Sequence, residues 1–145
     1  MSSSHIIKLV AGIDNLDDFY AIQQMEIIDY HGQLAVPCWT RYKPKQAEDI
    51  LRDGGSIYRV LKNRIQCRHK ILGFEMVETT HNGTRCMIVQ SAEMIQTVST
   101  ARRPFQGWRY LKPTDIPRDI GPYIPGTKNS IPPEMEQDLK DAGLF

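Results

Sequence analysis

The 145-residue sequence has no apolar run that approaches the roughly 20 residues a membrane-spanning helix requires. Its N-terminus, from Met1 to Lys8, also lacks the basic start and long apolar stretch of a secretory signal peptide. These two absences predict a cytoplasmic protein with no membrane partner.

Cysteine is scarce, and its spacing excludes two common kinds of scaffold. Cys38, Cys67 and Cys86 are odd in number and far apart, and no C-x-x-C pair occurs. Disulfide frameworks and zinc sites both need closer or paired cysteines. Free cysteines are usually buried, so we expect three reduced thiols in the core. The cations after Cys67 would lower the pKa of its thiol only if that thiol were exposed.

Motifs that carry catalysis are missing as well. The sequence contains no G-x-S-x-G, no P-loop, no dinucleotide fingerprint and no H-E-x-x-H. Its four histidines are scattered, and none stands at metal-ligand spacing. The residues therefore predict neither a metal nor a cofactor, and they leave any catalytic residue unknown.

What the sequence does have is the length and composition of one globular domain. Its hydrophobic content of 41% and charged content of 24% are ordinary, and 145 residues can bury a substantial core. We expect a single domain over residues 1–145. Its parts would be a sheet core with two helices over 1–99, an ordered coil rich in proline, basic and aromatic residues over 100–130, and a C-terminal helix over 131–145.

Apolar periodicity and chain breakers predict the individual elements. Helices are expected from residue 16 to about 30, after a cap at Asp14 or Asn15, and over 44–52. Strands are expected over 6–10, 34–42, 56–62, 65–77, 85–90 and 94–99. Pro37 makes the second of these strands an edge or irregular one, and Gly73 bends the fourth.

The density of proline after residue 100 precludes regular helix or sheet there. The fold class is therefore α+β, with a small, mostly antiparallel sheet curled into a barrel. An N-terminal helix, a short inserted helix, the coil and the C-terminal helix would accompany this barrel.

Charge is distributed unevenly behind a net value of +1. Residues 1–40 carry one Lys against five acids, residues 41–118 carry fifteen Lys and Arg against seven acids, and residues 119–145 carry two against five. A basic centre between acidic ends favours a polyanionic partner, although scattered surface charge gives the same counts.

The most informative segment alternates aromatic and basic side chains between two prolines, over residues 102–113. Unpaired bases stack on aromatic faces, and Arg or Lys neutralises phosphates. The candidate nucleic-acid contacts here are Arg102, Arg103, Trp108, Arg109, Tyr110 and Lys112. In a mixed alternative, Phe105 and Trp108 anchor the coil in the core and the arginines point outward.

A second basic cluster, Arg41, Lys43 and Lys45, stands just before the short predicted helix. A helix N-terminus with nearby cations suits an anion. A solvated turn around Pro44 explains the same residues.

Several blocks of the sequence resemble a bacterial family catalogued as domain of unknown function 1489. They are residues 5–9 with Gly12, 40–45, 53–58, 68–73 and 102–118, in the order of the family. The nonapeptide from Arg103 to Leu111 is the most specific of them. The family's name implies no activity, so this resemblance supplies an identity without a mechanism.

The order of elements is also similar to small RNA-binding barrels of the PUA and ASCH type. In those domains a helix and a glycine-rich turn contact the nucleic-acid backbone, and residues 43–56 would correspond here. The resemblance implies binding of RNA or another polyanion. Because ASCH-like domains include hydrolases of modified nucleosides, an alternative is a site built from Thr40, Lys43 or Lys45, and Glu75. A protein-interaction module with an acidic partner is a third possibility.

Overall fold

A computed structural model describes residues 4–103 and 105–125 of the chain. The expected C-terminal helix over 131–145 lies outside these residues. The described elements, in chain order, are β1 (His5–Leu9), α1 (Leu16–Gln24), β2 (Ile28–Tyr30), β3 (Gln33–Thr40), α2 (Ala47–Arg52), β4 (Ser56–Leu61), β5 (Arg64–Thr79), β6 (Gly83–Ser91), β7 (Ile95–Ala101), β8 (Trp108–Leu111), the 3-10 turn η1 (Pro113–Asp115) and β9 (Asp119–Pro122).

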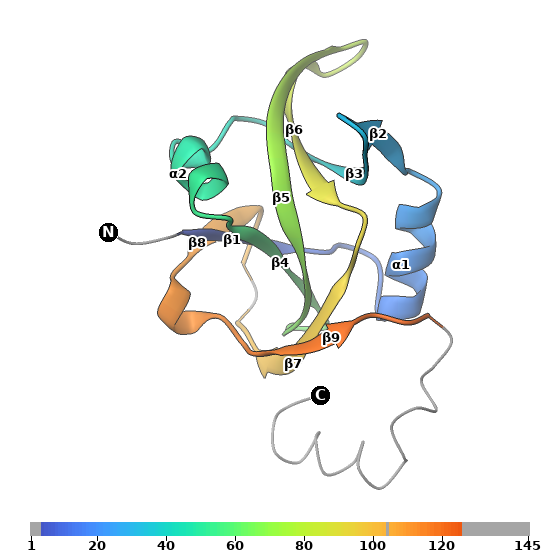
Figure 1. Ribbon diagram of the computed structural model, residues 1–145, viewed down its shortest axis with the longest axis vertical. Coiled ribbons are helices and arrows are strands. Elements are labelled where there is room, and N and C mark those ends of the chain that lie inside the picture. Colours follow the sequence, from blue (N-terminus) through green and yellow to red (C-terminus); the bar gives the residue numbers. More distant parts are fainter. Residues whose placement is uncertain (1–3, 104, 126–145) are drawn as a thin grey trace, which may run out of the picture.

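The sheet is built around the 16-residue strand β5, which pairs with different neighbours along its length. Its first half pairs with β4 on one side and with β7 on the other, and β7 pairs with β9. Its second half pairs with β6, which leads on to β3 and β2. Figure 1 shows β5 and β6 as two long strands that run side by side along the molecule.

Beyond β5, the pairing path continues through β4 and β1 and ends at β8. All described pairs are antiparallel except β1 with β4, so the expectation of a mostly antiparallel sheet is confirmed. The prediction that the sheet curls into a barrel was wrong. Strands β2 and β8 stand at opposite ends of the path and do not pair with each other, which leaves the sheet open.

Gly73 marks the bend of β5, as the sequence predicted. The register with β6 shifts between Ile71 and Gly73. A Cβ atom at Gly73 would lie 2.8 Å from Cζ of Tyr30 and closer still to its hydroxyl oxygen. That hydroxyl donates a hydrogen bond of 2.6 Å to Oε2 of Glu75. The Tyr30 side chain of β2 therefore packs directly against the backbone of β5 at the bend.

The core consists of three clusters that lie on both faces of β1 and β4. Ile6 and Ile57 belong to a cluster that includes α2, β3 and β6, whereas Ile7 and Tyr58 belong to one that includes residues 105–116. A third cluster packs α1 against β4, β5 and Met94. Because side chains alternate along a strand, a strand with a core cluster on each face is buried along its whole length. Every residue of β4 is buried, including the polar Ser56 and Arg59.

The first helix is shorter than expected, and the prediction that it extends to about Tyr30 was wrong. Asn15 caps it as predicted, since its side chain accepts a hydrogen bond of 2.8 Å from the backbone N–H of Asp18. After the helix ends at Gln24, β2 forms a hairpin with β3. His31 and Gly32 both have positive φ, as the tight turns of hairpins require.

The proline-rich segment is less irregular than expected, because β8 and β9 lie within it. The prediction that proline precludes sheet there was wrong. No proline interrupts β8, since Pro113 follows it, and Pro122 is the last residue of β9. Proline at the end of an edge strand removes no ladder hydrogen bond that the sheet needs.

Pro37 was expected to make its strand an edge or irregular one, yet β3 lies between β2 and β6. The β2 pairing extends only as far as Ala35, while Pro37 is paired with Val89 of β6. One side of the strand is therefore locally free at Pro37, and a missing N–H is tolerated there.

Polar residues are buried among the apolar ones in the centre of the sheet. The three cysteines are free and buried as predicted, and burial raises the pKa of Cys67 to about 12. His69 is completely buried, with Nδ1 2.8 Å from the carbonyl oxygen of Ser91. Burial lowers the pKa of His69 from 6.5 to about 4.

Gly73→Ala should destabilise the fold by about 1–3 kcal/mol, because the added methyl displaces Tyr30 from the bend. In a Tyr30→Ala background the same substitution should be nearly neutral. Urea denaturation of the four proteins of this double-mutant cycle measures the coupling, which we expect to exceed about 1 kcal/mol. Equal effects of Gly73→Ala in both backgrounds would contradict the proposed contact.

Stability should fall as the pH is lowered from about 6.5 towards 4. In that range the unfolded chain protonates His69, and the folded chain keeps it neutral, so protons favour unfolding. The pKa difference corresponds to at most about 3.4 kcal/mol. Chemical denaturation at pH 7 and pH 4.5 should therefore show a smaller loss for His69→Gln than for the native chain. Parallel losses in both proteins would refute this account.

Candidate nucleic-acid interface

Three arginines of the predicted interface gather at one cavity. Arg102, Arg103 and Arg109, together with Phe105 and Ala101, line a hollow of about 430 Å³. The guanidinium of Arg109 lies over the ring of Phe105, 5.7 Å from its centre. No acidic residue lines this hollow, so its positive charge is uncompensated locally.

Backbone contacts hold both sides of this hollow in place. The N–H of Arg102 donates a 2.8 Å hydrogen bond to the carbonyl oxygen of Asn63, in the turn between β4 and β5. Arg109 stands on β8, which is paired with β1 through the register Ile7 to Arg109. The arginines are thus attached to the sheet at two separate points.

Trp108 and Tyr110 lie on the opposite side of β8 from Arg109. Both rings are half-buried and pack against the core cluster that includes α2, with an edge-to-face contact of 5.0 Å between their centres. The Tyr110 hydroxyl accepts a hydrogen bond of 3.1 Å from the N–H of Gln46, the residue before α2. This bond attaches β8 to the loop that carries Lys43 and Lys45.

The loop before α2 carries the second basic cluster and an exposed ring. Arg41, Lys43 and Lys45 are exposed, while Pro44 between them is buried. Tyr42 is 69% exposed, and the Arg41 guanidinium lies 5.5 Å from the centre of its ring. Sequence reasoning did not include Tyr42 among the candidate contact residues. The available signal was its place between Arg41 and Lys43, since the flanking cations favour a solvated position.

The seven cations of the predicted interface share one property, which is the lack of a carboxylate partner among the described residues. We call this set the basic surface; it comprises Arg41, Lys43, Lys45, Arg102, Arg103, Arg109 and Lys112. By contrast, Arg52 pairs with Asp49 and Asp53.

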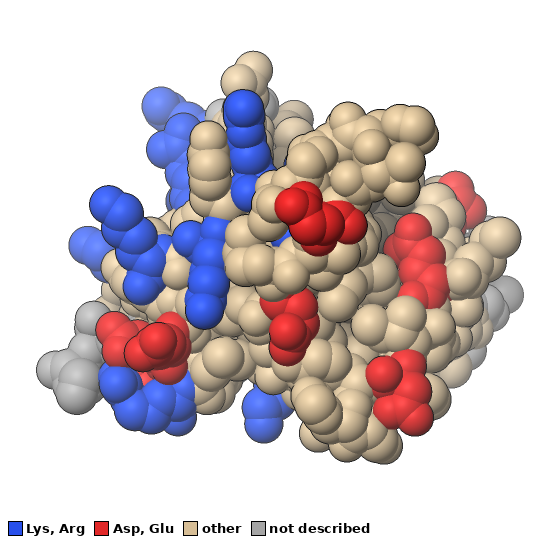
Figure 2. All heavy atoms as spheres, turned by 90° about the horizontal axis from the view of Figure 1, so that it is seen from above, with Lys and Arg blue, Asp and Glu red and all other residues tan. Residues whose placement is uncertain are grey.

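Opposite charges are partly separated on the face that Figure 2 shows. Lys and Arg gather mainly towards the left of that view, on the side where Figure 1 places α2, whereas Asp and Glu lie at the right, in the centre, and at the lower left beside basic atoms. The unequal distribution of charge along the sequence therefore has a counterpart in space.

The residues of the alternative hydrolase site do not form an obvious catalytic group. Thr40 is buried, with 8% of its surface exposed. Glu75 accepts the hydrogen bond from Tyr30 described above, which occupies one carboxylate oxygen. Neither residue lines the cavities of about 400, 430 and 460 Å³ found in the described chain.

Two further findings concern the described residues alone. No helix in residues 4–103 or 105–125 has the length and hydropathy to cross a membrane. In the same part of the chain, no three His, Cys, Asp or Glu side chains stand close enough together to hold a metal ion.

The fold and this surface define a mostly β protein with few helices, an open mixed sheet and a basic edge. The chain belongs to the family described as "Protein of unknown function (DUF1489)", whose model matches residues 6–145. No curated protein and no solved structure matches the sequence.

Proposed function

We propose that this protein binds RNA through the basic surface. The observation that carries the proposal is the absence of carboxylate partners around its seven cations, in the described chain. Unneutralised cations near one another attract polyanions and release condensed counterions when they bind phosphates.

The arrangement favours an extended strand over a compact anion. The three-arginine hollow lies on one side of β8, and the cluster before α2 adjoins the other side through the bond between Tyr110 and Gln46. Strand β8 ends the pairing path of the described sheet. A phosphate backbone that crosses this edge contacts both groups of cations.

Single-stranded RNA fits better than a duplex because of Tyr42. Its exposed ring, with Arg41 beside it, offers a face on which an unpaired base stacks. Trp108 and Tyr110 are half-buried, so their first role is to position β8, and only their free edges remain for a ligand.

Binding to single-stranded RNA should weaken steeply with salt, with a slope of about −0.7 in log K against log salt for each phosphate neutralised. Combining Arg102→Gln, Arg103→Gln and Arg109→Gln should make this slope shallower by about 2. Fluorescence anisotropy over a range of salt concentrations measures both values.

The matched control is Arg52→Gln, which removes a cation that already has acidic partners. It should leave the salt slope unchanged. Thermal denaturation verifies that the triple variant is folded, since Arg109 also contacts Phe105. Binding that does not depend on salt, or that the triple variant retains in full, contradicts the proposal. Equal affinity for an acidic peptide would instead indicate a protein partner.

Tyr42→Ala should weaken RNA binding by about 1–3 kcal/mol through the loss of one stacked base. Tyr42→Phe should retain the affinity, because it keeps the aromatic face, whereas Tyr42→Leu should behave like the alanine variant. The side chain is largely exposed, so none of the three should change the melting temperature appreciably. Equal affinities for Phe and Leu at this position would exclude stacking.

A further inference from the structure

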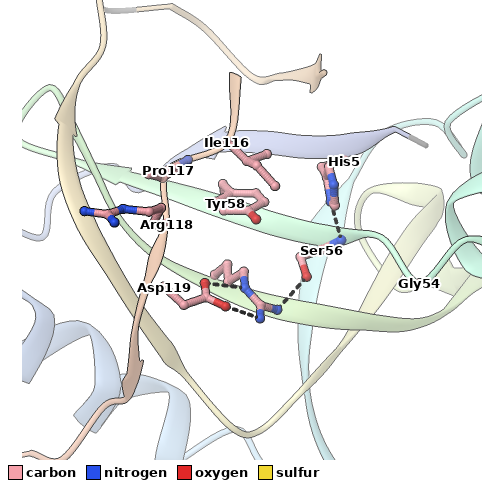
Figure 3. Close-up of a pocket in the computed structure, with 9 residues that line it drawn as sticks. His5, Gly54, Ser56, Tyr58, Ile116, Pro117, Arg118 and Asp119 are labelled. Atoms are coloured by element: carbon pink, nitrogen blue, oxygen red, sulfur yellow. Dashed lines mark hydrogen bonds and ion pairs between the residues drawn. The ribbon is translucent and has the colours of Figure 1, made fainter. Parts of the chain in front are cut away.

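A second cavity, of about 400 Å³, lies on the face of β4 that points away from α2, and none of the predicted interface residues lines it. Figure 3 shows His5 and Ser56 on one side of it and Pro117, Arg118 and Asp119 on the other, with Tyr58 and Ile116 between them. It therefore lies between β1, β4 and the segment that leads into β9. A volume of this size fits a small organic molecule.

The first polar group of this cavity is a neutral histidine with a defined tautomer. Nδ1 of His5 accepts a hydrogen bond of 3.0 Å from the backbone N–H of Ser56. Burial, with the nearby Arg68 charge, also lowers the pKa of His5. The ring proton is therefore on Nε2, which is left as a hydrogen-bond donor.

An ion pair holds the opposite end of the cavity. Arg68 donates two hydrogen bonds to the Asp119 carboxylate, at 2.8 and 2.7 Å, and a third of 2.9 Å to Oγ of Ser56. This neutralises the single acidic residue that lines the cavity. Ser56, only 3% exposed, accepts from Arg68 and keeps its own proton to donate.

The Tyr58 hydroxyl supplies a third donor. The residue is 2% exposed, and its hydroxyl has no hydrogen-bond partner in the described chain. Burial raises the pKa of Tyr58 to about 12, so the group stays protonated at neutral pH. Arg118 extends away from the ion pair at the rim and adds one positive charge.

The available polar groups are thus mainly donors, and the lining charge is positive. We propose that this cavity binds a small organic oxyanion, which is either a carboxylate or a phosphate monoester. Its oxygens accept hydrogen bonds from His5, Ser56 and Tyr58. Its apolar part packs against Ile116 and Pro117. The proposal is independent of RNA binding, because the two sites share no residue.

The test is a titration of the whole chain with phenyl phosphate and with benzoate. Isothermal calorimetry measures the affinity, and amide shifts in NMR spectra locate the binding site. The two probes distinguish a phosphate from a carboxylate ligand. Inorganic phosphate should bind more weakly, since it lacks the apolar part, and the cation benzylamine should not bind. The largest shifts are expected at residues 54–58 and 116–119.

Tyr58→Phe removes the hydroxyl and preserves the ring, and it should weaken the better probe about tenfold or more, as loss of a donor to a charged acceptor does. Ser56→Ala should do the same. The control Tyr110→Phe removes a hydroxyl of the other site and should leave the affinity unchanged. Conversely, Tyr58→Phe should not alter RNA binding, which separates failure of one proposal from failure of the other.

Three outcomes overturn the proposal. They are no binding of either anion, equal binding of benzylamine, and amide shifts confined to residues outside the cavity. If Tyr58→Phe does not fold, the amide shifts of the native chain still show whether the probes bind in this cavity.

Discussion

Strand β5 bends at Gly73, where the absence of a side chain leaves room for the ring of Tyr30. The bend lets one strand serve two sets of partners, β4 and β7 before it and β6 after it. The positions of the outer strands depend on these pairings. Through β4 and β1 they place β8, with its basic edge, and through β7 they place β9. Both proposed sites therefore rest on the pairings made by the first half of β5.

The second constraint is that β4 is buried on both faces. One face is covered by α2 and the other strands, and the other face needs a cover that the compact part of the sheet cannot supply. The segment after β7 provides this cover through Phe105 and Ile116. This cover, to which Leu111 of β8 also belongs, is incomplete. The hollow beside Phe105 and the cavity beside Ile116 are the two gaps that result.

Local features of the fold could be predicted from the sequence, and long-range ones could not. Alternation gave the position of β4, Asn15 gave the start of α1, and Gly73 gave the bend. The parallel pairing of β1 with β4 has no local signal in the sequence. The lack of pairing between β2 and β8, which leaves the sheet open where a barrel was expected, has none either. The prediction that a proline-rich segment excludes strands was too strong, because a strand of four residues such as β8 fits between two prolines in the sequence.

The same division applies to the sites. The cations of the basic surface are visible in the sequence because they cluster within short segments. The second cavity joins His5 to Ser56 and Arg68 to Asp119, each pair 51 positions apart, and no sequence pattern connects them.

Unpaired cations also bear on stability, because like charges held together oppose the compact state. Arg52 and Arg68 avoid this cost through their carboxylate partners. The basic surface does not avoid it in the described chain, and a bound polyanion would relieve the repulsion. A ligand that binds only the folded chain stabilises it by mass action. The proposed binding of a polyanion would therefore be linked to folding through the same charges.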